Sequence, residues 1–346
     1  MDWLKTKLYT EAGYEYTSDK LKAGLSLPLS YNRINYSDAL NQLDNNLNKL
    51  FINPALNIKY QTSTENYVTA NYSFRNDLGG INDVYRGTIL KNYRSLFSND
   101  APIAESKTHN IGAGFNFRKA MQMLFTNLTA NYSDTELSTI SAYNLSNNIQ
   151  QKIVLPLNNH IRSLSLAANA SKYLFSLKST VNAGVSFAQS RYSQLQNNAL
   201  LPFNTQTIAY KAGIEAKLTN FINWSYNANF AITDNEAMVT NGIKTNFKQL
   251  RQQSSLAITT IKNVYLNLSA EHLFTRQSSQ PDLKYLFADA NMRYKWLKMK
   301  TDIEFGITNL TNIKSFDAIY LSANSLTTGT YYIPGRVAML KATFNF

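Results

Sequence analysis

The last twelve residues of the chain, Gly335 to Phe346, read G-R-V-A-M-L-K-A-T-F-N-F and alternate between two faces. One face holds Ala338, Leu340, Ala342, Phe344 and Phe346, and the other holds Val337, Met339, Lys341, Thr343 and Asn345. A period of two is typical of a strand with one apolar and one mostly polar face. In water, an apolar terminal strand invites aggregation. Lipid can solvate such a face, so the terminus favours a strand of a membrane-spanning β-barrel.

Composition is compatible with this fold and excludes several others. The 346 residues show no shift in composition that would mark a domain boundary. Hydrophobic residues make up 44% and the mean hydropathy is −0.30. No apolar run approaches the roughly 20 residues that a membrane helix needs. Cysteine is absent, which excludes disulfides and thiolate metal sites.

Charge and the amino-terminal sequence limit partners and processing. The formal net charge is +12, but Lys and Arg are scattered singly, which argues against nucleic-acid binding. The start, M-D-W-L-K-T-K-L-Y, lacks the basic and apolar regions of a signal peptide. Because a barrel must be exported, we expect a mature chain or a fragment.

Strand-like segments come in pairs joined by short turns, and longer polar loops separate the pairs. The pairs are Lys5–Tyr16 with Leu21–Tyr31, Leu50–Tyr60 with Tyr67–Arg75, Thr108–Phe117 with Met123–Tyr132, Ile161–Ala170 with Phe175–Phe187, Thr207–Lys217 with Ile222–Thr233, Phe247–Thr259 with Val264–Phe274, and Leu283–Tyr294 with Lys300–Thr308. The final strand stands alone. This pattern predicts an all-β, antiparallel transmembrane barrel with about fifteen strands in the chain, short periplasmic turns and long extracellular loops.

The faces of these strands differ in charge. Apolar residues dominate one face, whereas most charged residues of the strands lie on the other. The charged or titratable residues on the apolar face are His109, Arg162, Lys248, His272 and Lys284, and we expect each at a strand end beside a long loop. A charge costs about 2–4 kcal/mol at the bilayer midplane and little near the interface. This distribution favours a membrane barrel over a soluble sandwich.

The sequence offers little for catalysis or metal binding. The three histidines, at 109, 160 and 272, lie in separate segments without ligand spacing, and no G-x-S-x-G or phosphate-binding loop occurs. We therefore expect no enzyme activity, no metal and no cofactor. In the first long loop, Leu40, Leu43, Leu47 and Leu50 recur at helical intervals, with Asp38 as a possible cap. This spacing predicts a helix over Asp38–Phe51, either packed on the barrel mouth or acting as a ligand-binding lid.

Several segments resemble the carboxy-terminal barrel of TonB-dependent receptors, specifically the Bacteroidetes-type outer-membrane β-barrel family. They are L-F-I-N-P-A-L-N-I-K-Y at Leu50–Tyr60, E-N-Y-V-T-A-N-Y-S-F-R at Glu65–Arg75, E-F-G-I-T-N-L-T-N at Glu304–Asn312, and the final block through Phe346. The resemblance implies a barrel of 22 strands. It also implies an amino-terminal plug and TonB box, and substrates such as siderophores, glycans, cobalamin or peptides.

The resemblance implies the location, the function and the partners. We expect the bacterial cell outer membrane and uptake of a nutrient, namely a siderophore, glycan or peptide. The alternative is a structural or surface-interaction barrel without transport. Expected partners are outer-membrane lipid and lipopolysaccharide, the barrel-assembly machinery, and an amino-terminal plug and strands missing from residues 1–346, through which TonB would act.

Two groups of residues are candidate sites. Arg162, Lys248 and Lys284 are expected at the outer-leaflet level, where lipopolysaccharide phosphates would contact them. Ala342, Phe344 and Phe346 are the expected carboxy-terminal signal for barrel assembly. We also expect an incomplete barrel over residues 1–346, because its first and last strands run in the same direction. About seven strands would be absent relative to the 22 that the resemblance implies.

Overall fold

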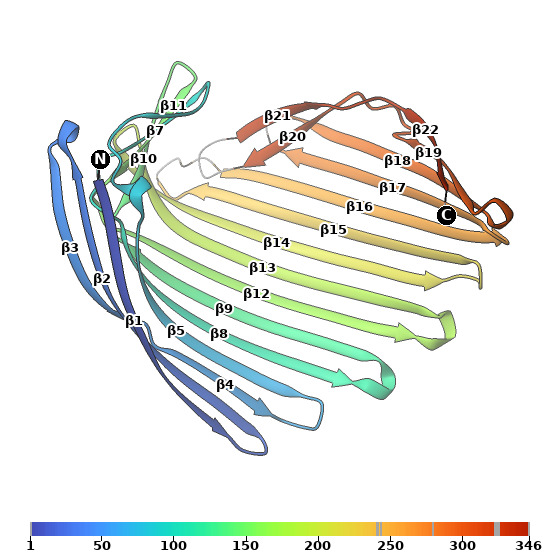
Figure 1. The fold of residues 1–346 in the computed structure, drawn as a ribbon, viewed down its shortest axis with the longest axis horizontal. Coiled ribbons are helices and arrows are strands. Elements are labelled where there is room, and N and C mark those ends of the chain that lie inside the picture. The colour runs from blue at the N-terminus through green and yellow to red at the C-terminus, as the bar shows by residue number, and fades with distance from the viewer. Residues whose placement is uncertain (1, 240–241, 243, 279, 322–325, 345–346) are drawn as a thin grey trace.

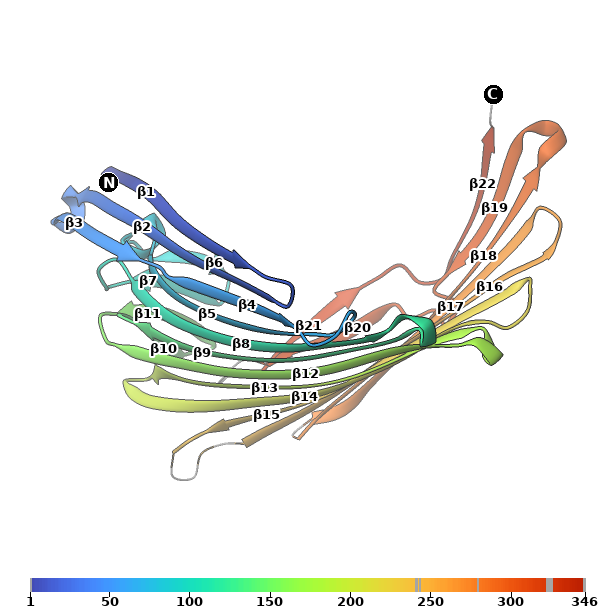
Figure 2. The same cartoon turned by 90° about the horizontal axis from the view of Figure 1, so that it is seen from below.

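The computed structural model describes residues 2–239, 242, 244–278, 280–321 and 326–344. Most of these residues form one large, mainly antiparallel sheet that curves into an open trough (Figures 1 and 2). The helices among them are short 3-10 segments, and none is long and apolar enough to cross a membrane.

The wall of the trough is a nearly sequential series of strands. In spatial order these are β1 (Asp2–Thr17), β2 (Leu21–Asp38), β3 (Leu43–Ile52) in line with β4 (Ala55–Gln61), β5 (Tyr67–Leu78), β8 (Glu105–Lys119), β9 (Leu124–Leu137), β12 (Asn159–Leu174), β13 (Ser179–Gln196), β14 (Ala199–Lys217), β15 (Ile222–Ala237), β16 (Lys244–Ile261), β17 (Val264–Gln277), β18 (Gln280–Trp296), β19 (Thr301–Thr308) and β22 (Val337–Phe344). Because β3 and β4 share one place, the described residues supply fifteen strand positions, each antiparallel to its neighbours. The predicted number and direction of strands are confirmed.

The alternation of residues produces two chemically distinct faces. In β15, Trp224, Tyr226, Ala228 and Phe230 lie on one face, which we call the apolar face. Asn223, Ser225, Asn227 and Asn229 lie on the other, the polar face. The register carries the same division from strand to strand. Hollows lined mainly by polar side chains open on the polar face, so it is the concave side of the trough.

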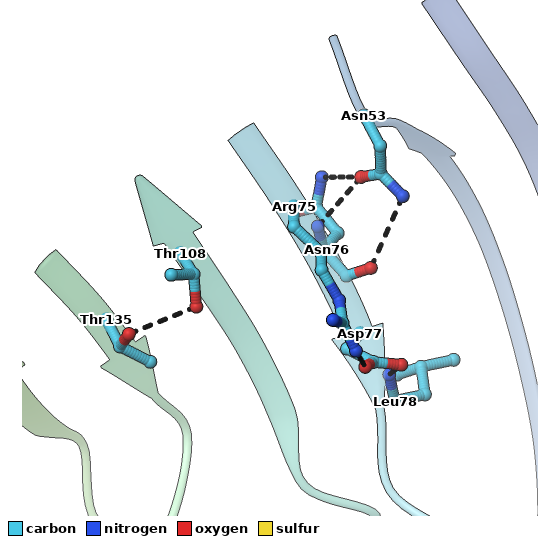
Figure 3. A network of polar contacts seen from close by, with 7 residues as sticks. All are labelled: Asn53, Arg75, Asn76, Asp77, Leu78, Thr108 and Thr135. Atoms are coloured by element: carbon cyan, nitrogen blue, oxygen red, sulfur yellow. Dashed lines mark hydrogen bonds and ion pairs between the residues drawn. The ribbon is translucent and has the colours of Figure 1, made fainter. Parts of the chain in front are cut away.

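A proline interrupts the third strand position. Pro54 cannot donate a ladder hydrogen bond, and β3 ends before it while β4 begins after it. Asn53 joins the break to β5: its Oδ1 accepts from the backbone N–H of Asn76 at 2.7 Å, and its Nδ2 donates to the carbonyl of Asn76 at 3.5 Å (Figure 3). Beyond this point, Thr108 and Thr135 join β8 to β9 through their hydroxyls at 3.1 Å.

The predicted helix over Asp38–Phe51 is wrong. Asp38 does cap a turn, because its carboxylate accepts from the backbone N–H of Leu40 at 3.1 Å. However, that 3-10 turn covers only Ala39–Asn41, and Leu43–Ile52 pairs with β2 as a strand. The leucine spacing suits a helix, but the hairpin ladder with β2 supplies hydrogen-bond partners along the whole segment and decides its conformation.

Other boundaries also move. The predicted turn at Ser171–Leu174 is strand, and the chain reverses in a 3-10 turn at Phe175–Leu177. Most of the predicted long loops contain strands, since the wall strands extend well beyond their expected ends. Strands β20 (Ser315–Leu321) and β21 (Leu326–Tyr332) pair with each other in a separate two-stranded sheet, outside the wall.

Candidate functional site

The concave wall carries a repeated arrangement of asparagine and glycine. Gly213 lies in register between Asn182 and Asn227 on the two flanking strands. A Cβ atom at Gly213 would lie 2.5 Å from the Oδ1 atom of each asparagine. Glycine therefore leaves room for both amides to lean over the backbone. Gly112, between Asn71 and Asn131, repeats the arrangement on β8. The result is a smooth surface of amide donors and acceptors.

A hollow of about 340 Å³ lies on this wall between β8 and β14. Two cations, Arg118 and Lys211, line it together with amide side chains from four asparagines. No carboxylate is among its lining residues, and neither cation forms an ion pair with any described residue. The polar groups of the hollow are therefore amides and cations, set among apolar side chains such as Phe117 and Phe125.

Farther along the wall, cations are neutralised by acids on neighbouring strands. Arg251 on β16 pairs with Glu271 on β17 at 2.5 Å. Arg293 on β18 pairs with Asp302 and, at 3.6 Å, with Glu304 on β19. These cross-strand pairs join β16 to β17 and β18 to β19. Arg118 and Lys211, by contrast, form no ion pair among the described residues.

The long connections at one end of the wall form a second, smaller arrangement of strands. It comprises β6 (Ile89–Asn92), β7 (Ser95–Asn99), β10 (Ile140–Ser146) and β11 (Ile149–Leu155), which gather near the ends of β1 to β3 (Figure 1). Strand β7 runs parallel to β11, and β10 runs parallel to the end of β13. We call this group, with the end of β13, the loop sheet. It ties two separate long connections, 79–104 and 138–158, to the end of the β13–β14 hairpin.

Apolar packing fixes the loop sheet to the wall. Ile34 and Tyr36 of β2 pack with Val84 and Ile103 of the 79–104 connection, and Ile34 and Val84 are fully buried. Lys49 adds an ion pair with Glu105 at 2.8 Å. The long-loop end therefore has a small hydrophobic core of its own. Burial also raises the pKa of the Tyr143 hydroxyl in β10.

The candidate lipopolysaccharide residues lie in two places. Lys248 is in register with Arg276 of β17, and Lys284 is in register with Phe274 of the same strand. Phe274 and Arg276 are two residues apart, so they lie on the same face of β17. Arg162 lies four strand positions from Lys248 and pairs with Asp134 at 3.4 Å. The structure thus brings Lys248 and Lys284 near one another and leaves Arg162 apart. Sequence reasoning missed Arg276. Its spacing of two residues from Phe274 could have placed it on the apolar face.

Two residues show that the apolar face is less uniform than expected. Lys172 lies on it at the short-turn end of β12, in register with Val181. His272 lies five residues before the end of β17, where its Nδ1 and the Oε1 of Gln252 are 2.9 Å apart. Gln252 in turn donates to the Tyr226 hydroxyl at 2.7 Å. Titratable residues on this face are therefore not confined to the long-loop end.

The carboxy-terminal residues sit at an edge of the wall. Ala342 and Phe344 of β22 are in register with Ile303 and Thr301 of β19, and the Phe344 side chain is 61% exposed. Phe346 lies outside the described residues. A role of the three residues in barrel assembly stays a prediction. No group of three or more potential metal ligands occurs among the described residues.

Comparisons with known proteins identify the fold. No protein-family model matches the chain, and no curated protein matches it in sequence. The open form of the ferric-catecholate import receptor Fiu from E. coli K12 matches 99% of the chain with a TM-score of 0.53 and 10% identity. The closed form matches 99% with a TM-score of 0.54 and 9% identity. The chain spans 64% of the length of the receptor chain in both. The receptor-barrel fold predicted from the sequence is confirmed.

Proposed function

We propose that this chain forms part of the wall of an outer-membrane receptor that imports a nutrient. The observation that carries the proposal is the match over 99% of the chain to an import receptor. The apolar face supports a position in lipid, since strands with an outward apolar face and a polar interior suit a membrane barrel. We infer transport, without enzymatic conversion, across the bacterial outer membrane.

The polar face supports import because it is built to contact polar ligands or a polar protein domain. The wall presents amides at Asn182 and Asn227 and unpaired cations at Arg118 and Lys211. A ligand or plug passing along this surface would exchange hydrogen bonds with water for hydrogen bonds with the wall. The nutrient class we propose is a siderophore, glycan or peptide, taken up with TonB through a plug.

Closure of the barrel requires strands from outside the described set. Strands β1 and β22 each pair on one side within the described residues, with β2 and β19, and they lie at opposite ends of the sheet (Figure 2). With fifteen positions between and including them, both run in the same direction. An odd number of additional antiparallel strands would close the ring, as bacterial barrels normally do. We propose that such strands complete the wall, since open edges in lipid leave backbone groups unsatisfied.

Growth of the native host tests the import proposal. The gene is deleted, and growth is measured with an iron siderophore, an oligosaccharide or a peptide as the limiting nutrient in turn. We expect one of these conditions to show a growth defect that the intact gene restores. The double variant Arg118→Gln/Lys211→Gln should restore growth less well than Lys5→Gln/Lys7→Gln, a matched change on the polar face of β1.

Unchanged growth under every condition, together with loss of surface attachment, would favour the structural or surface-interaction alternative. The coding DNA upstream of Met1 gives an independent check. A reading frame for a plug and a TonB box there would support import, and a signal peptide directly before Met1 would count against it.

A further inference from the structure

The short connections at one end of the wall contain most of the chain's excess positive charge. We call them the short-turn rim, defined as residues 17–22, 59–67, 117–124, 171–179, 216–222, 260–264 and 294–302. These ranges contain twelve Lys and Arg residues but only Asp19, Glu65 and Asp302 as acids. The rim therefore has a formal charge of +9, out of +12 for the whole chain.

The cations of the rim lack acidic partners. None of its twelve Lys and Arg residues forms an ion pair within the described part of the chain. Ten of the twelve are exposed; Lys59 and Lys295 are half-buried and lie over the rings of Tyr67 and Tyr265. A row of exposed, unpaired cations of one sign repels itself, so an anionic partner would stabilise it.

The turns place large apolar side chains beside these cations. Three of them are 3-10 turns of the same design, at Ala120–Gln122, Phe175–Leu177 and Leu297–Met299. Met121 is 93% exposed, Leu177 is 61% exposed and Leu297 is 64% exposed. Exposed apolar residues among cations are typical of surfaces that bind at the headgroup level of an anionic membrane.

The backbone of two turns reinforces this arrangement. Each 3-10 turn ends in a residue with left-handed backbone geometry, a conformation that glycine adopts at least cost. At Phe175–Leu177 and Leu297–Met299 that residue is a lysine, Lys178 with φ 46° and Lys300 with φ 48°. Lysine thus occupies the positions at which the turn geometry itself would favour glycine or asparagine.

We propose that the short-turn rim binds the phosphate headgroups of anionic phospholipids in the membrane leaflet that the short turns reach. The inference rests on the proposed outer-membrane location and adds a lipid partner to it. Lysines at the turn tips would contact phosphates, while Met121, Leu177 and Leu297 enter the boundary between headgroups and acyl chains. The rim is continuous with the apolar face of the wall, so one bilayer can contact both.

Flotation of the full chain with vesicles tests the proposal. The vesicles contain phosphatidylcholine alone, or phosphatidylcholine mixed with phosphatidylglycerol. The rim variant changes Lys20, Lys119, Lys178, Lys262, Lys298 and Lys300 to Gln. The matched control changes Arg33, Lys91, Lys107, Lys152, Arg191 and Lys244 to Gln, which removes the same charge from elsewhere in the chain. Circular dichroism checks that each variant retains its β-structure.

We expect the rim variant to bind phosphatidylglycerol vesicles at least about tenfold more weakly than the unaltered chain, since each Lys near an anionic surface contributes severalfold. The control should change about twofold or less, and neutral vesicles should not distinguish the three proteins. Replacing the same six lysines by Arg should preserve binding. This variant keeps the proposal testable if the Gln variant fails to fold.

Equal weakening in the rim variant and the control would show that only total charge matters and would overturn the proposal. Unchanged binding of the rim variant would also overturn it and leave an acidic protein as the partner for the rim. Vesicle binding needs no nutrient uptake. A failure of the import proposal in the growth assay would therefore be distinct from a failure here.

Discussion

The two ends of the wall differ in how many of their cations form ion pairs. At the long-loop end, several cations have acidic partners: Lys49 with Glu105, Arg162 with Asp134 and Arg276 with Asp282 are ion pairs. At the short-turn rim, no described cation has such a partner. The long-loop end is also packed around buried apolar residues, whereas the turns expose theirs. The long-loop end therefore neutralises part of its charge internally, whereas the short-turn rim is suited to an external partner.

The largest expected effect concerns the packed end. Ile34→Ala removes a fully buried side chain that contacts the 79–104 connection. We expect the free energy of unfolding to fall by about 2–5 kcal/mol. Urea unfolding of the chain in detergent measures the change, and proteolysis within 79–104 reports local loosening. Leu177→Ala at the rim, where the side chain is 61% exposed, is the control with little expected change. Equal losses in both variants would contradict the contrast between the ends.

The next effect separates the middle of the wall from both ends. Ala168 lies on the apolar face of β12, in register with Leu128 and Val185. Ala168→Arg should destabilise the lipid-embedded chain by about 2–4 kcal/mol if this position is near the midplane. Its neighbour Ala167 lies on the polar face, so Ala167→Arg should cost much less. A similar cost for the two, measured by unfolding from lipid vesicles, would mean that the apolar face is not in lipid.

A smaller effect is expected from the asparagine and glycine arrangement. Gly213→Ala places a methyl group against Asn182 and Asn227, and overpacking of this kind costs about 1–3 kcal/mol. Gly24→Ala on β2 is the matched control, because no heavy atom lies within 4 Å of the Cβ position there. Thermal unfolding of both variants should show a loss only for Gly213→Ala. A loss of the same size at Gly24 would indicate a general intolerance of alanine on this face.

The smallest effect concerns the candidate lipopolysaccharide residues. Replacing Arg162, Lys248 and Lys284 by Ala should lower thermal stability more in lipopolysaccharide-containing membranes than in neutral detergent. Each exposed pair contributes no more than about 1 kcal/mol. The ion pair of Arg162 with Asp134 is lost in both media, so the difference between media isolates the lipid contribution. The same shift in both would remove the lipid role.

The sequence was sufficient to predict the wall, because alternation is a local signal that each strand carries by itself. It was insufficient for Leu43–Ile52, whose leucines fit a helical repeat equally well. There, pairing with β2 decides the outcome, and that ladder depends on residues outside the segment. The strands within 133–160 were missed for the same reason, since β11 pairs with β7, which lies about fifty residues away in the chain.

The candidate site was predictable only in part. The parity of Lys248 and Lys284 places them on the apolar face, as expected. The separation of Arg162 from them depends on how many strands lie between, and the partner Asp134 appears only when strands are brought into register. The charge of the short-turn rim was readable from the sequence, by adding the charges of the turns rather than scanning for basic runs.

The loop sheet has a mechanical consequence for the wall. The parallel contacts of β7 with β11 and of β10 with β13 span connections that leave from β5, β9 and β13. These contacts join the strands at the long-loop end of the wall. No such contact joins the described short turns at the opposite end. If the curvature of the wall changes, the strands should move least at the long-loop end, where these contacts join them, and separate most at the short-turn end. Any gating motion would then be largest where the short turns lie.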